Sequence, residues 1–346
     1  MGASATTTGT ATVRPASRCA IGVDLGGTHC RAALVDLAEG TTLDEVKLPV
    51  VAREPERVAD LVLEAVTRLI GDAAARGAAR GAAGGEHGGV GIGFAGMLRG
   101  WSGVVANSPN FGWREVDFRA LLRARLGSSV ELYNDLNAIT AGESRYGAGR
   151  GTDHMLCVYV GTGVGGGLLL DGTIYAGAGH LAGEIGHTKV IPGGRPCGCG
   201  ARGCLEAYVS GRNIAARAQQ ELGQGAGDGP RHSSALGLAG ELSRLHAGHL
   251  DEAARAGDPY ARALWAEIAP YLGLVLANAV TLLNPSRVVL GGGVWEGAPE
   301  LRRLATESYQ ALVNAPSGEG VQLVSTELGD RAGVLGAAWL IAQSVR

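Results

Sequence analysis

Residues 19–36 read CAIGVDLGGTHCRAALVD, and this stretch decides the fold of the 346-residue chain. CAIGVDL predicts a buried strand, the glycines after it predict a turn, and HCRAALVD alternates as a second strand does. Residues 155–177, MLCVYVGTGVGGGLLLDGTIYAG, repeat the order of strand, glycine turn and strand. This weak internal repeat predicts two related domains.

The rest of the chain alternates strand-like runs with helical patterns. Apolar residues recur on one face from Val58 to about Ala75, and a long helix is predicted from Tyr260 to Leu283, where Asn284-Pro285 ends it. This alternation favours an α/β fold. The two strand–turn–strand openings predict antiparallel pairs within mixed sheets, which fits less well with one all-parallel, doubly wound sheet.

The composition excludes several classes of protein. The chain is 46% hydrophobic and 18% charged, which is typical of a globular protein. Its net charge of −3, without a block of Lys and Arg, predicts no nucleic-acid partner.

Residues 1–18 are small and polar and lack the apolar segment of a signal peptide, so we expect a disordered tail and a cytoplasmic location. We expect no membrane partner, because no apolar run looks long enough to cross a bilayer. Residues 223–234, GQGAGDGPRHSS, predict a mobile surface loop.

A first candidate for phosphate binding is the turn Asp24-Leu25-Gly26-Gly27-Thr28. Glycines let backbone N–H groups approach an anion, and the Thr28 hydroxyl adds a donor. The Asp24 carboxylate suits a hydrated magnesium ion near phosphate. An ordinary β-hairpin turn explains the same glycines equally well, so local sequence leaves both interpretations open.

Two further glycine turns follow strands. Residues 161–167, GTGVGGG, formally match the dinucleotide-binding pattern G-x-G-x-x-G, but that pattern needs a helix to begin there. LLLDGTIYAG predicts a strand instead, so a second phosphate-binding turn is the better interpretation. Residues 291–293, GGG, form a third turn suited to packing against a nucleoside. The chain contains no Walker-type motif, G-x-x-x-x-G-K-[ST].

Asn134-Asp135 ends the strand-like run SSVELY. Ligands bind at the carboxyl ends of strands in α/β sheets, and phosphoryl transfer needs a residue that orients and deprotonates the attacking hydroxyl. The competing interpretation is a helix N-cap, for which Asn and Asp are favoured, and local sequence alone prefers it.

The spacing His187-x9-Cys197-x-Cys199-x4-Cys204 is the strongest local signal. One imidazole and three thiolates are the ligands of a closed, tetrahedral, structural zinc site. A disulfide or chance clustering are the alternatives, but a cytoplasmic protein argues against the first and three cysteines within eight residues against the second. Glu184 and Glu206 flank the cluster. With a free ring N–H of His187 they suit a polyol, although exposed charges beside a loop would look the same.

The chain resembles the ROK family of sugar kinases and repressors in its motifs and in their order. These motifs are DLGGT, FAG followed by SPN, ND, GTGVGGG, GEIGH, CGCGARGCLE and LGGG. The resemblance implies two actin-like ATPase (ribonuclease H-like) domains with mixed sheets and a sugar–ATP cleft between them. It implies residues 19–136 plus 330–346 as one domain and 137–329, with the zinc site, as the other. It implies ATP, Mg²⁺ and structural Zn²⁺, and a homodimer or higher homo-oligomer.

By the same resemblance, Asp135 is the catalytic base. The sugar-binding residues it implies are Gly96, Asn110, Asn134, Asp135, Glu184, His187 and Glu206. The nucleotide-site residues are Asp24, Gly26, Gly27, Thr28, Thr162, Gly163 and Gly292. The zinc ligands are His187, Cys197, Cys199 and Cys204.

The sequence departs from the family pattern at His29, where Lys or Asn is more familiar, and at Tyr133, where Glu is common. SPNFGW resembles the glucokinase branch more than the N-acetylated amino-sugar kinases, which favours glucose or an analogue with a free amine such as kanosamine. The alternatives are an N-acetylglucosamine or N-acetylmannosamine kinase, a non-catalytic sugar binder, and a sugar-sensing regulator. A DNA-binding repressor is disfavoured because only about 20 polar residues precede DLGGT.

Overall fold

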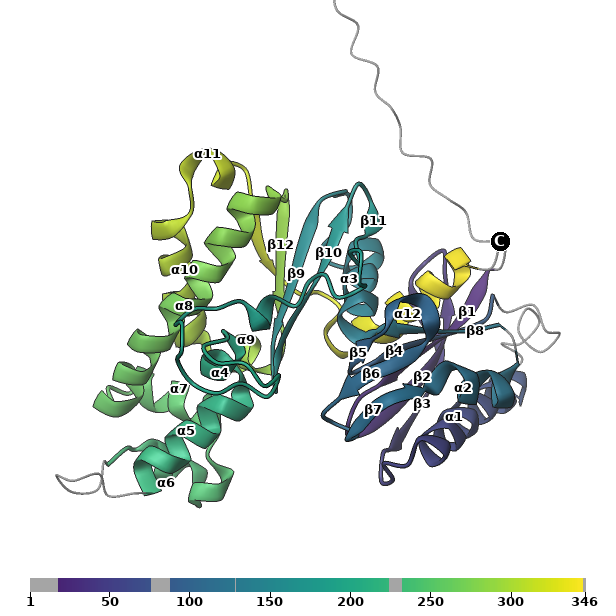
Figure 1. The fold of residues 1–346 in the computed structure, drawn as a ribbon, viewed down its shortest axis with the longest axis horizontal. Helices are drawn as coiled ribbons and strands as arrows, with labels where there is room; N and C mark the ends of the chain where they lie inside the picture. The colour runs from purple at the N-terminus through teal and green to yellow at the C-terminus, as the bar shows by residue number, and fades with distance from the viewer. Residues whose placement is uncertain (1–17, 76–87, 128, 224–231, 345–346) are drawn as a thin grey trace, which may run out of the picture.

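The structure is a computed structural model that describes residues 18–75, 88–127, 129–223 and 232–344. Two five-stranded sheets lie side by side along the long axis of the molecule, each with helices packed on it (Figure 1). Almost all of the predicted tail lies outside the described residues. The same is true of most of the predicted loop at 223–234. The α/β class and the mixed sheets that the sequence predicts are both confirmed.

The first sheet begins with the stretch that opens the chain. Its strands, in spatial order, are β3 (Thr41–Pro49), β2 (His29–Asp36), β1 (Cys19–Leu25), β4 (Val90–Phe94) and β8 (Val130–Asn134). β1, β2 and β3 pair antiparallel, whereas β4 and β8 run parallel to β1. The DLGGT turn therefore lies at the same edge of the sheet as the end of β8 and the residues after it.

The second sheet has the same plan, as the sequence repeat predicts. Its strands are β11 (Thr173–Ile174), β10 (Val164–Leu170), β9 (Met155–Val160), β12 (Arg287–Gly291) and β13 (Gln322–Ser325). β9, β10 and β11 pair antiparallel, and β12 and β13 run parallel to β9. Because the strand β10 follows residues 161–163, and no helix begins there, the dinucleotide-binding interpretation of GTGVGGG is excluded.

A small third sheet, β5 (Met97–Leu98), β6 (Val104–Ser108) and β7 (Trp113–Asp117), extends the first half. Four aromatic rings fill the space behind it, with centroids 4.8–5.6 Å apart: Phe94, Phe111, Trp113 and Phe118. This cluster fixes the segment that contains Asn107 and Asn110. The helices α1 (Pro55–Ala75) and α2 (Phe118–Leu126) pack beside it.

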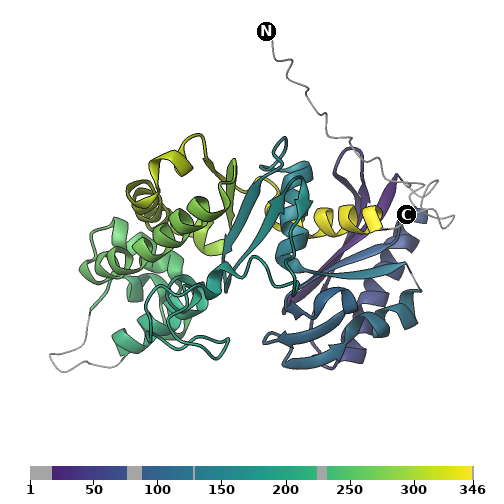
Figure 2. The same cartoon turned by 45° about the horizontal axis from the view of Figure 1, so that its top comes forward.

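The last helix, α12 (Ala332–Ser344), lies on the first sheet although it ends the chain (Figure 2). Glycines make this approach possible. A Cβ on Gly22 of β1 would lie 1.8 Å from the Val334 carbonyl oxygen, and one on Gly91 of β4 would lie 2.0 Å from that of Ala337. On its other side α12 packs against α3 (Asp135–Tyr146), where a Cβ on Gly336 would lie 1.7 Å from the Ala138 carbonyl oxygen.

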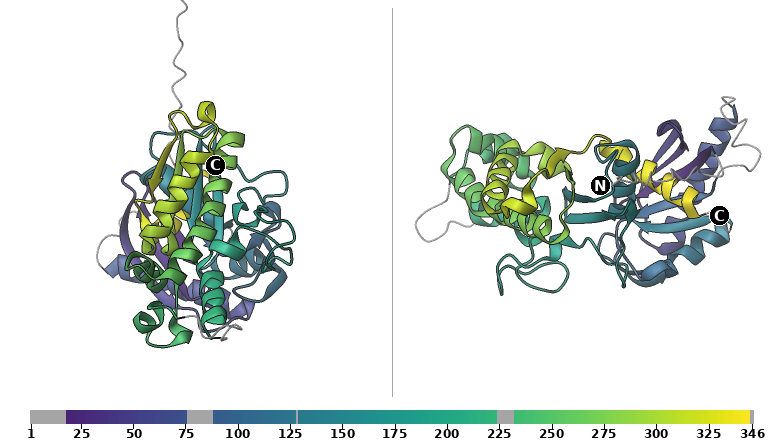
Figure 3. Two further views of the ribbon diagram at one scale, coloured as in Figure 1. Left: turned by 90° about the vertical axis from the view of Figure 1, so that its left-hand side faces the viewer. Right: turned by 90° about the horizontal axis from the view of Figure 1, so that it is seen from above.

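Helices form most of the second half, beyond its sheet (Figure 3). They are α4 (Glu206–Val209), α5 (Gly211–Gly223), α6 (Ala235–Ala239), α7 (Ala247–Arg255), α8 (Pro259–Leu283), α9 (Gly293–Gly297), α10 (Pro299–Leu312) and α11 (Ala315–Gly318). By length and composition α8 is apolar enough to cross a membrane, with a mean hydropathy of 1.6 over 18 residues. The expectation that no run is long enough is therefore wrong. One face of α8, with Trp265 and Ile268, is buried in the core of this half, as in a soluble core helix.

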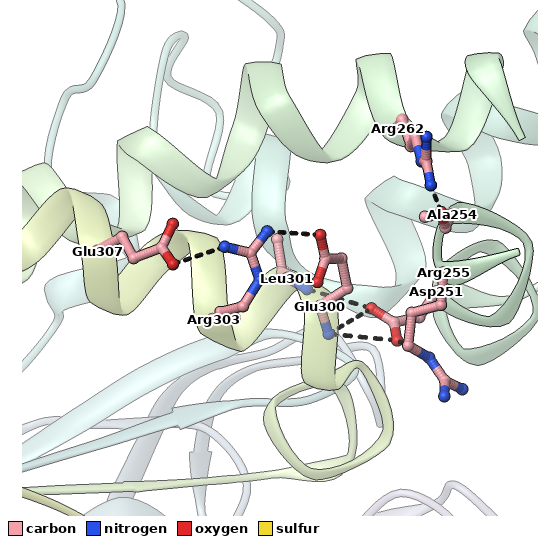
Figure 4. A network of polar contacts seen from close by, with 8 residues as sticks. All are labelled: Asp251, Ala254, Arg255, Arg262, Glu300, Leu301, Arg303 and Glu307. Atoms are coloured by element: carbon pink, nitrogen blue, oxygen red, sulfur yellow. Dashed lines mark hydrogen bonds and ion pairs between the residues drawn. The ribbon is translucent and has the colours of Figure 1, made fainter. Parts of the chain in front are cut away.

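The start of α10 is capped from another helix rather than by its own sequence. Ala298 stands at its N-cap position, where no side chain accepts a hydrogen bond. Instead, Asp251 of α7 is fully buried, and its Oδ1 accepts from the backbone N–H groups of Glu300 (3.0 Å) and Leu301 (3.1 Å) (Figure 4). This contact ties α7 to α10 and completes the helical layer.

Candidate active site

A cavity of about 410 Å³ lies between the two halves, and residues from both of them line it. The first half contributes Gly96, Asn107 and Asn110. The second half contributes the 161–166 turn, Glu184, His187, Glu206 and Gly292. Asn134 and Asp135, at the junction of β8 and α3, lie between these two sets. The cavity thus brings together the end of β8, the glycine turns of the second sheet and the polar residues of the 184–206 segment.

The structure separates the two roles that local sequence left open at Asn134-Asp135. Asn134 is the N-cap of α3, because its Oδ1 accepts from the backbone N–H groups of Leu136 (3.0 Å) and Asn137 (3.2 Å). Its Nδ2 donates to the Gly96 carbonyl at 3.2 Å and to Asp135 Oδ1 at 3.1 Å. Asp135 is the first residue of the helix and is not needed as its cap.

Only one oxygen of the Asp135 carboxyl group has partners among the described residues. Oδ1 accepts from Asn134 Nδ2 and from the Leu136 N–H at 2.9 Å. The pKa of Asp135 is raised to about 7, mainly by burial and also by the negative charges of Asp24 and, to a lesser extent, Glu184, although the Leu136 amide lowers it. A half-buried carboxyl group with a pKa near neutrality suits a general base.

Asp24 lies behind the DLGGT turn, at the end of β1. Burial raises its pKa to about 6, although the facing Arg31 lowers it. A Cβ on Gly333, at the start of α12, would lie 3.2 Å from Asp24 Cγ. The turn itself lies beside Asn110, because a Cβ on Gly27 would lie 3.1 Å from Asn110 Cβ. Asp24, Gly26, Gly27 and Thr28 are close to the cavity but are not among the residues that line it.

The other two glycine turns do line the cavity. Gly161 donates its N–H to the Gly163 carbonyl at 2.9 Å, which closes the turn between β9 and β10. Gly292 has a φ of +94°, and a Cβ there would lie 2.6 Å from the Val160 carbonyl oxygen. Only glycine fits such a conformation and such an approach without strain. Thr162, Gly163 and Gly292 are therefore placed together, as the resemblance implies.

The predicted zinc ligands form one cluster. The ligand atoms of His187, Cys197, Cys199 and Cys204 all lie within 4.8 Å of one another. Cys199 Sγ and Cys204 Sγ are 3.8 Å apart, and Cys197 Sγ is 3.7 Å from His187 Nδ1. Bonds of about 2.3 Å to one tetrahedral zinc ion would hold two sulfurs about 3.8 Å apart, whereas a disulfide needs about 2.05 Å. All six cysteines of the chain are free, so the disulfide interpretation is wrong.

The cluster continues directly into the cavity. His187 Nδ1 faces the sulfur atoms, and Nε2 is 3.7 Å from Glu184 Oε2, at the cavity wall. Glu206 Oε1 is 3.8 Å from Cys197 Sγ, while Glu206 Oε2 accepts from the Val164 N–H of the second turn at 2.9 Å. Glu206 thus joins the cysteine loop to that turn, a contact that the sequence did not predict.

Several cavity residues are missing from the sequence-based site. Met97, Asn107, Tyr159, Arg212 and Asn213 line the cavity together with the predicted residues. Arg212 and Asn213 stand at the start of α5, which follows the CGCGARGCLE motif after the short helix α4, and this position is the one signal in the sequence that points to them. Asn107 lies in a strand and directly precedes the SPN motif, whereas Tyr159 lies in a strand that no motif distinguishes at that position.

Three comparisons relate the chain to known proteins. The model of a family described as the ROK family matches residues 20–344. A glucokinase of Streptomyces coelicolor is 34% identical over 321 residues, which cover 92% of this chain and 96% of the relative. An N-acetylmannosamine kinase of Escherichia coli is 33% identical over 331 residues, covering 93% and 98%. The solved structure of a ROK family glucokinase from Streptomyces griseus, in complex with glucose and AMPPNP, has a TM-score of 0.72 and 34% identity, covering 94% of this chain and 99% of that one.

Proposed function

Because the chain belongs to the ROK family, we propose that it is an ATP-dependent hexose kinase that phosphorylates the 6-hydroxyl of glucose or a close glucose analogue. The observation that carries this proposal is the position of Asp135. Its carboxyl group, with a pKa of about 7, lines the same cavity as two glycine turns and a set of polar side chains suited to a sugar. The relatives named glucokinase support the choice of sugar.

Asp135 acts as the base in this proposal. Its free carboxylate oxygen takes the proton of the 6-hydroxyl while that oxygen attacks the γ-phosphorus of ATP. The bond between the γ-phosphorus and the bridging oxygen breaks, and ADP leaves. Magnesium bound with the nucleotide supplies positive charge at the phosphates, and the Asp24 carboxylate is the group that suits its hydration shell. The N–H groups of the glycine turns hold the phosphate oxygens.

The sugar is assigned to the side of the cavity formed by Asn110, Asn134, Glu184 and His187. Carboxylate and amide oxygens accept hydrogen bonds from sugar hydroxyls, and the imidazole Nε2 offers a donor. Because His187 Nδ1 faces the cysteine sulfurs, a metal there would fix the ring and direct Nε2 at the sugar. The cysteine cluster is then a support of the sugar site.

We assign one structural Zn²⁺ to the cluster, on the four ligand types and their spacing. Elemental analysis should find about one zinc per chain, and removal with a chelator should unfold the 187–206 segment and abolish activity. Readdition of zinc should restore both. Zinc-free protein that stays folded and active would contradict the assignment.

The choice of sugar needs a direct test, since a glucokinase and an N-acetylmannosamine kinase are 34% and 33% identical to the chain. We expect ADP release in a coupled assay to be fastest with glucose or kanosamine among glucose, kanosamine, glucosamine, N-acetylglucosamine, N-acetylmannosamine, mannose, fructose and allose. A clear preference for an N-acetylated sugar would replace the glucose assignment with the alternative. No ADP release with any sugar would point to a sugar-binding regulator.

We also propose the domain division 19–136 with 330–346, and 137–329, with a homodimer or higher homo-oligomer as the assembly. The packing of α12 on the first sheet supports the division. Sedimentation at several protein concentrations measures the assembly. Small-angle scattering with and without sugar measures whether the two domains close on the ligand.

A further inference from the structure

We propose that Arg212 binds the phosphate chain of the donor nucleotide and is a further catalytic residue of the proposed phosphoryl transfer, an inference that rests on the proposed function. Arg212 stands second in α5, which follows the cysteine motif after the short helix α4. Among the described residues that line the cavity it is the one Lys or Arg, whereas three carboxylates, Asp135, Glu184 and Glu206, share the lining with it.

The charge balance of the cavity favours such a group. A nucleoside triphosphate brings several negative charges into a space that is already lined with carboxylates, and magnesium offsets only two of them. The DLGGT turn brings no Lys or Arg, since His29 follows it. The cation that pairs with Asp24 across the first sheet, Arg31, is held by Asp330 and by Glu45, 3.3 Å and 3.4 Å away. Arg31 is therefore not free to bind phosphate.

The backbone of Arg212 is fixed against the phosphate-binding turn. Gly211 donates its N–H to the Gly161 carbonyl at 2.8 Å, and Arg212 donates its own to the Thr162 carbonyl at 3.4 Å. A Cβ on Gly211 would lie 3.1 Å from the Gly161 carbonyl oxygen, so the glycine permits this close contact. The Arg212 side chain therefore starts beside Gly161 and Thr162, in the turn that would hold the phosphates.

The guanidinium group itself is uncommitted. The residue is exposed, and within the described part of the chain its side chain takes part in no hydrogen bond or ion pair. Its neighbour on the same helix, Arg217, is by contrast bound to Glu221 (2.8 Å) and Glu267 (2.6 Å). An unpaired guanidinium on the cavity wall is available for a bidentate contact with phosphate oxygens.

The test compares Arg212→Ala and Arg212→Lys with the natural protein in steady-state kinetics and calorimetry. For Arg212→Ala we expect kcat/KM for ATP to fall about 10- to 100-fold, while the dissociation constant for glucose without nucleotide changes less than about twofold. Arg212→Lys should recover part of the loss, because it keeps the charge but not the bidentate geometry. Arg244→Ala, which removes an exposed arginine outside the cavity lining, is the matched control and should change neither value.

Binding of MgADP and of adenosine then identifies the part of the nucleotide that Arg212 contacts. We expect Arg212→Ala to weaken MgADP binding and to leave adenosine binding unchanged. Equal losses for both ligands would show a contact with the base or ribose and overturn the phosphate assignment, as would unaltered kinetics in an active enzyme. A natural protein without kinase activity towards any sugar would instead refute the proposed function.

Discussion

Helix α3 carries two carboxylates with opposite surroundings, Asp135 in its first turn and Glu143 near its end. Asp135 lines the cavity, and the described residues supply partners to one of its oxygens only. Glu143 is fully buried, and its two oxygens accept from the Ala148 N–H (2.9 Å), the Leu328 N–H (3.1 Å), the Glu327 N–H (3.3 Å) and the Thr326 hydroxyl. No cation pairs with either group in the described part of the chain.

The difference shows how one helix supports both chemistry and architecture. Donors around Glu143 replace the water that burial removes, so this carboxylate stabilises the structure. Its donors come from the end of α3 and from the segment that leads from β13 back to α12, so Glu143 joins the two chain segments that cross between the halves. In the described part of the chain the second oxygen of Asp135 lacks such donors, and the carboxyl group therefore retains the proton affinity that a base needs.

Replacement of Asp135 by Asn is expected to have the largest effect on turnover. The amide keeps the size and the oxygen that accepts from Leu136 and Asn134, but it cannot take a proton. We expect kcat to fall by about 10²–10⁴, the usual contribution of a general base, while glucose binding largely persists. Coupled ADP release measures the first quantity and calorimetry the second. Near-normal turnover would remove Asp135 from the role of base.

Replacement of Glu143 by Gln is expected to have the opposite profile. The Gln amide nitrogen would face N–H donors, so at least one of them loses its acceptor in a buried place. We expect the free energy of unfolding to fall by roughly 3 kcal/mol, as measured by urea denaturation, with a smaller loss of kcat under conditions where the protein is folded. Thr326→Val, which removes one donor and keeps its shape, is the milder control. A Gln variant as stable as the natural protein would contradict the structural role.

The same comparison predicts the pH dependence of the reaction. Because the pKa of Asp135 lies near 7, the base is protonated in acid, and kcat/KM for the sugar should fall about tenfold per pH unit below pH 7. An ordinary aspartate would give a flat profile from pH 5 to 8. The Glu143→Gln variant should keep the natural midpoint, since Glu143 takes no part in proton transfer. A midpoint near pH 4 would contradict the surroundings described for Asp135.

The sequence predicts the parts of this site that depend on neighbours along the chain. The two strand–turn–strand units and the cysteine spacing are local, and each could be recognised from its own residues. The prediction omitted strand β3, in whose sequence only Val46, Lys47 and Leu48 alternate as a strand does, while Leu43 is exposed.

The remainder depends on contacts between distant segments. Glu143 stands in AGESRYG, where nothing shows that amides of residues 327 and 328 converge on it. The glycines of β1 and β4 are explained only by the return of α12, more than 200 residues later. Arg212 lies beside a recognisable motif but belongs to no motif itself. Side chains of this kind acquire their roles from tertiary structure, which local patterns do not contain.

The smallest expected effect is a gain in stability from Asp135→Asn. The folded state raises the pKa of Asp135 from 3.8 to about 7, so it holds the proton more tightly than the unfolded chain does. That stabilising contribution is complete below pH 4 and is lost as the pH rises to 7, above which a charged carboxylate remains in a half-buried place. The amide has no such charge. We therefore expect the variant to exceed the natural protein in free energy of unfolding by roughly 1–2 kcal/mol at pH 8, and by less at pH 5.

Urea denaturation with zinc present measures this difference in the free energy of unfolding. Asn134→Ala, which loses the cap of α3, is a control that should be destabilised at every pH. A gain that stays constant from pH 5 to 8 would mean that the charge of Asp135 is not the cause.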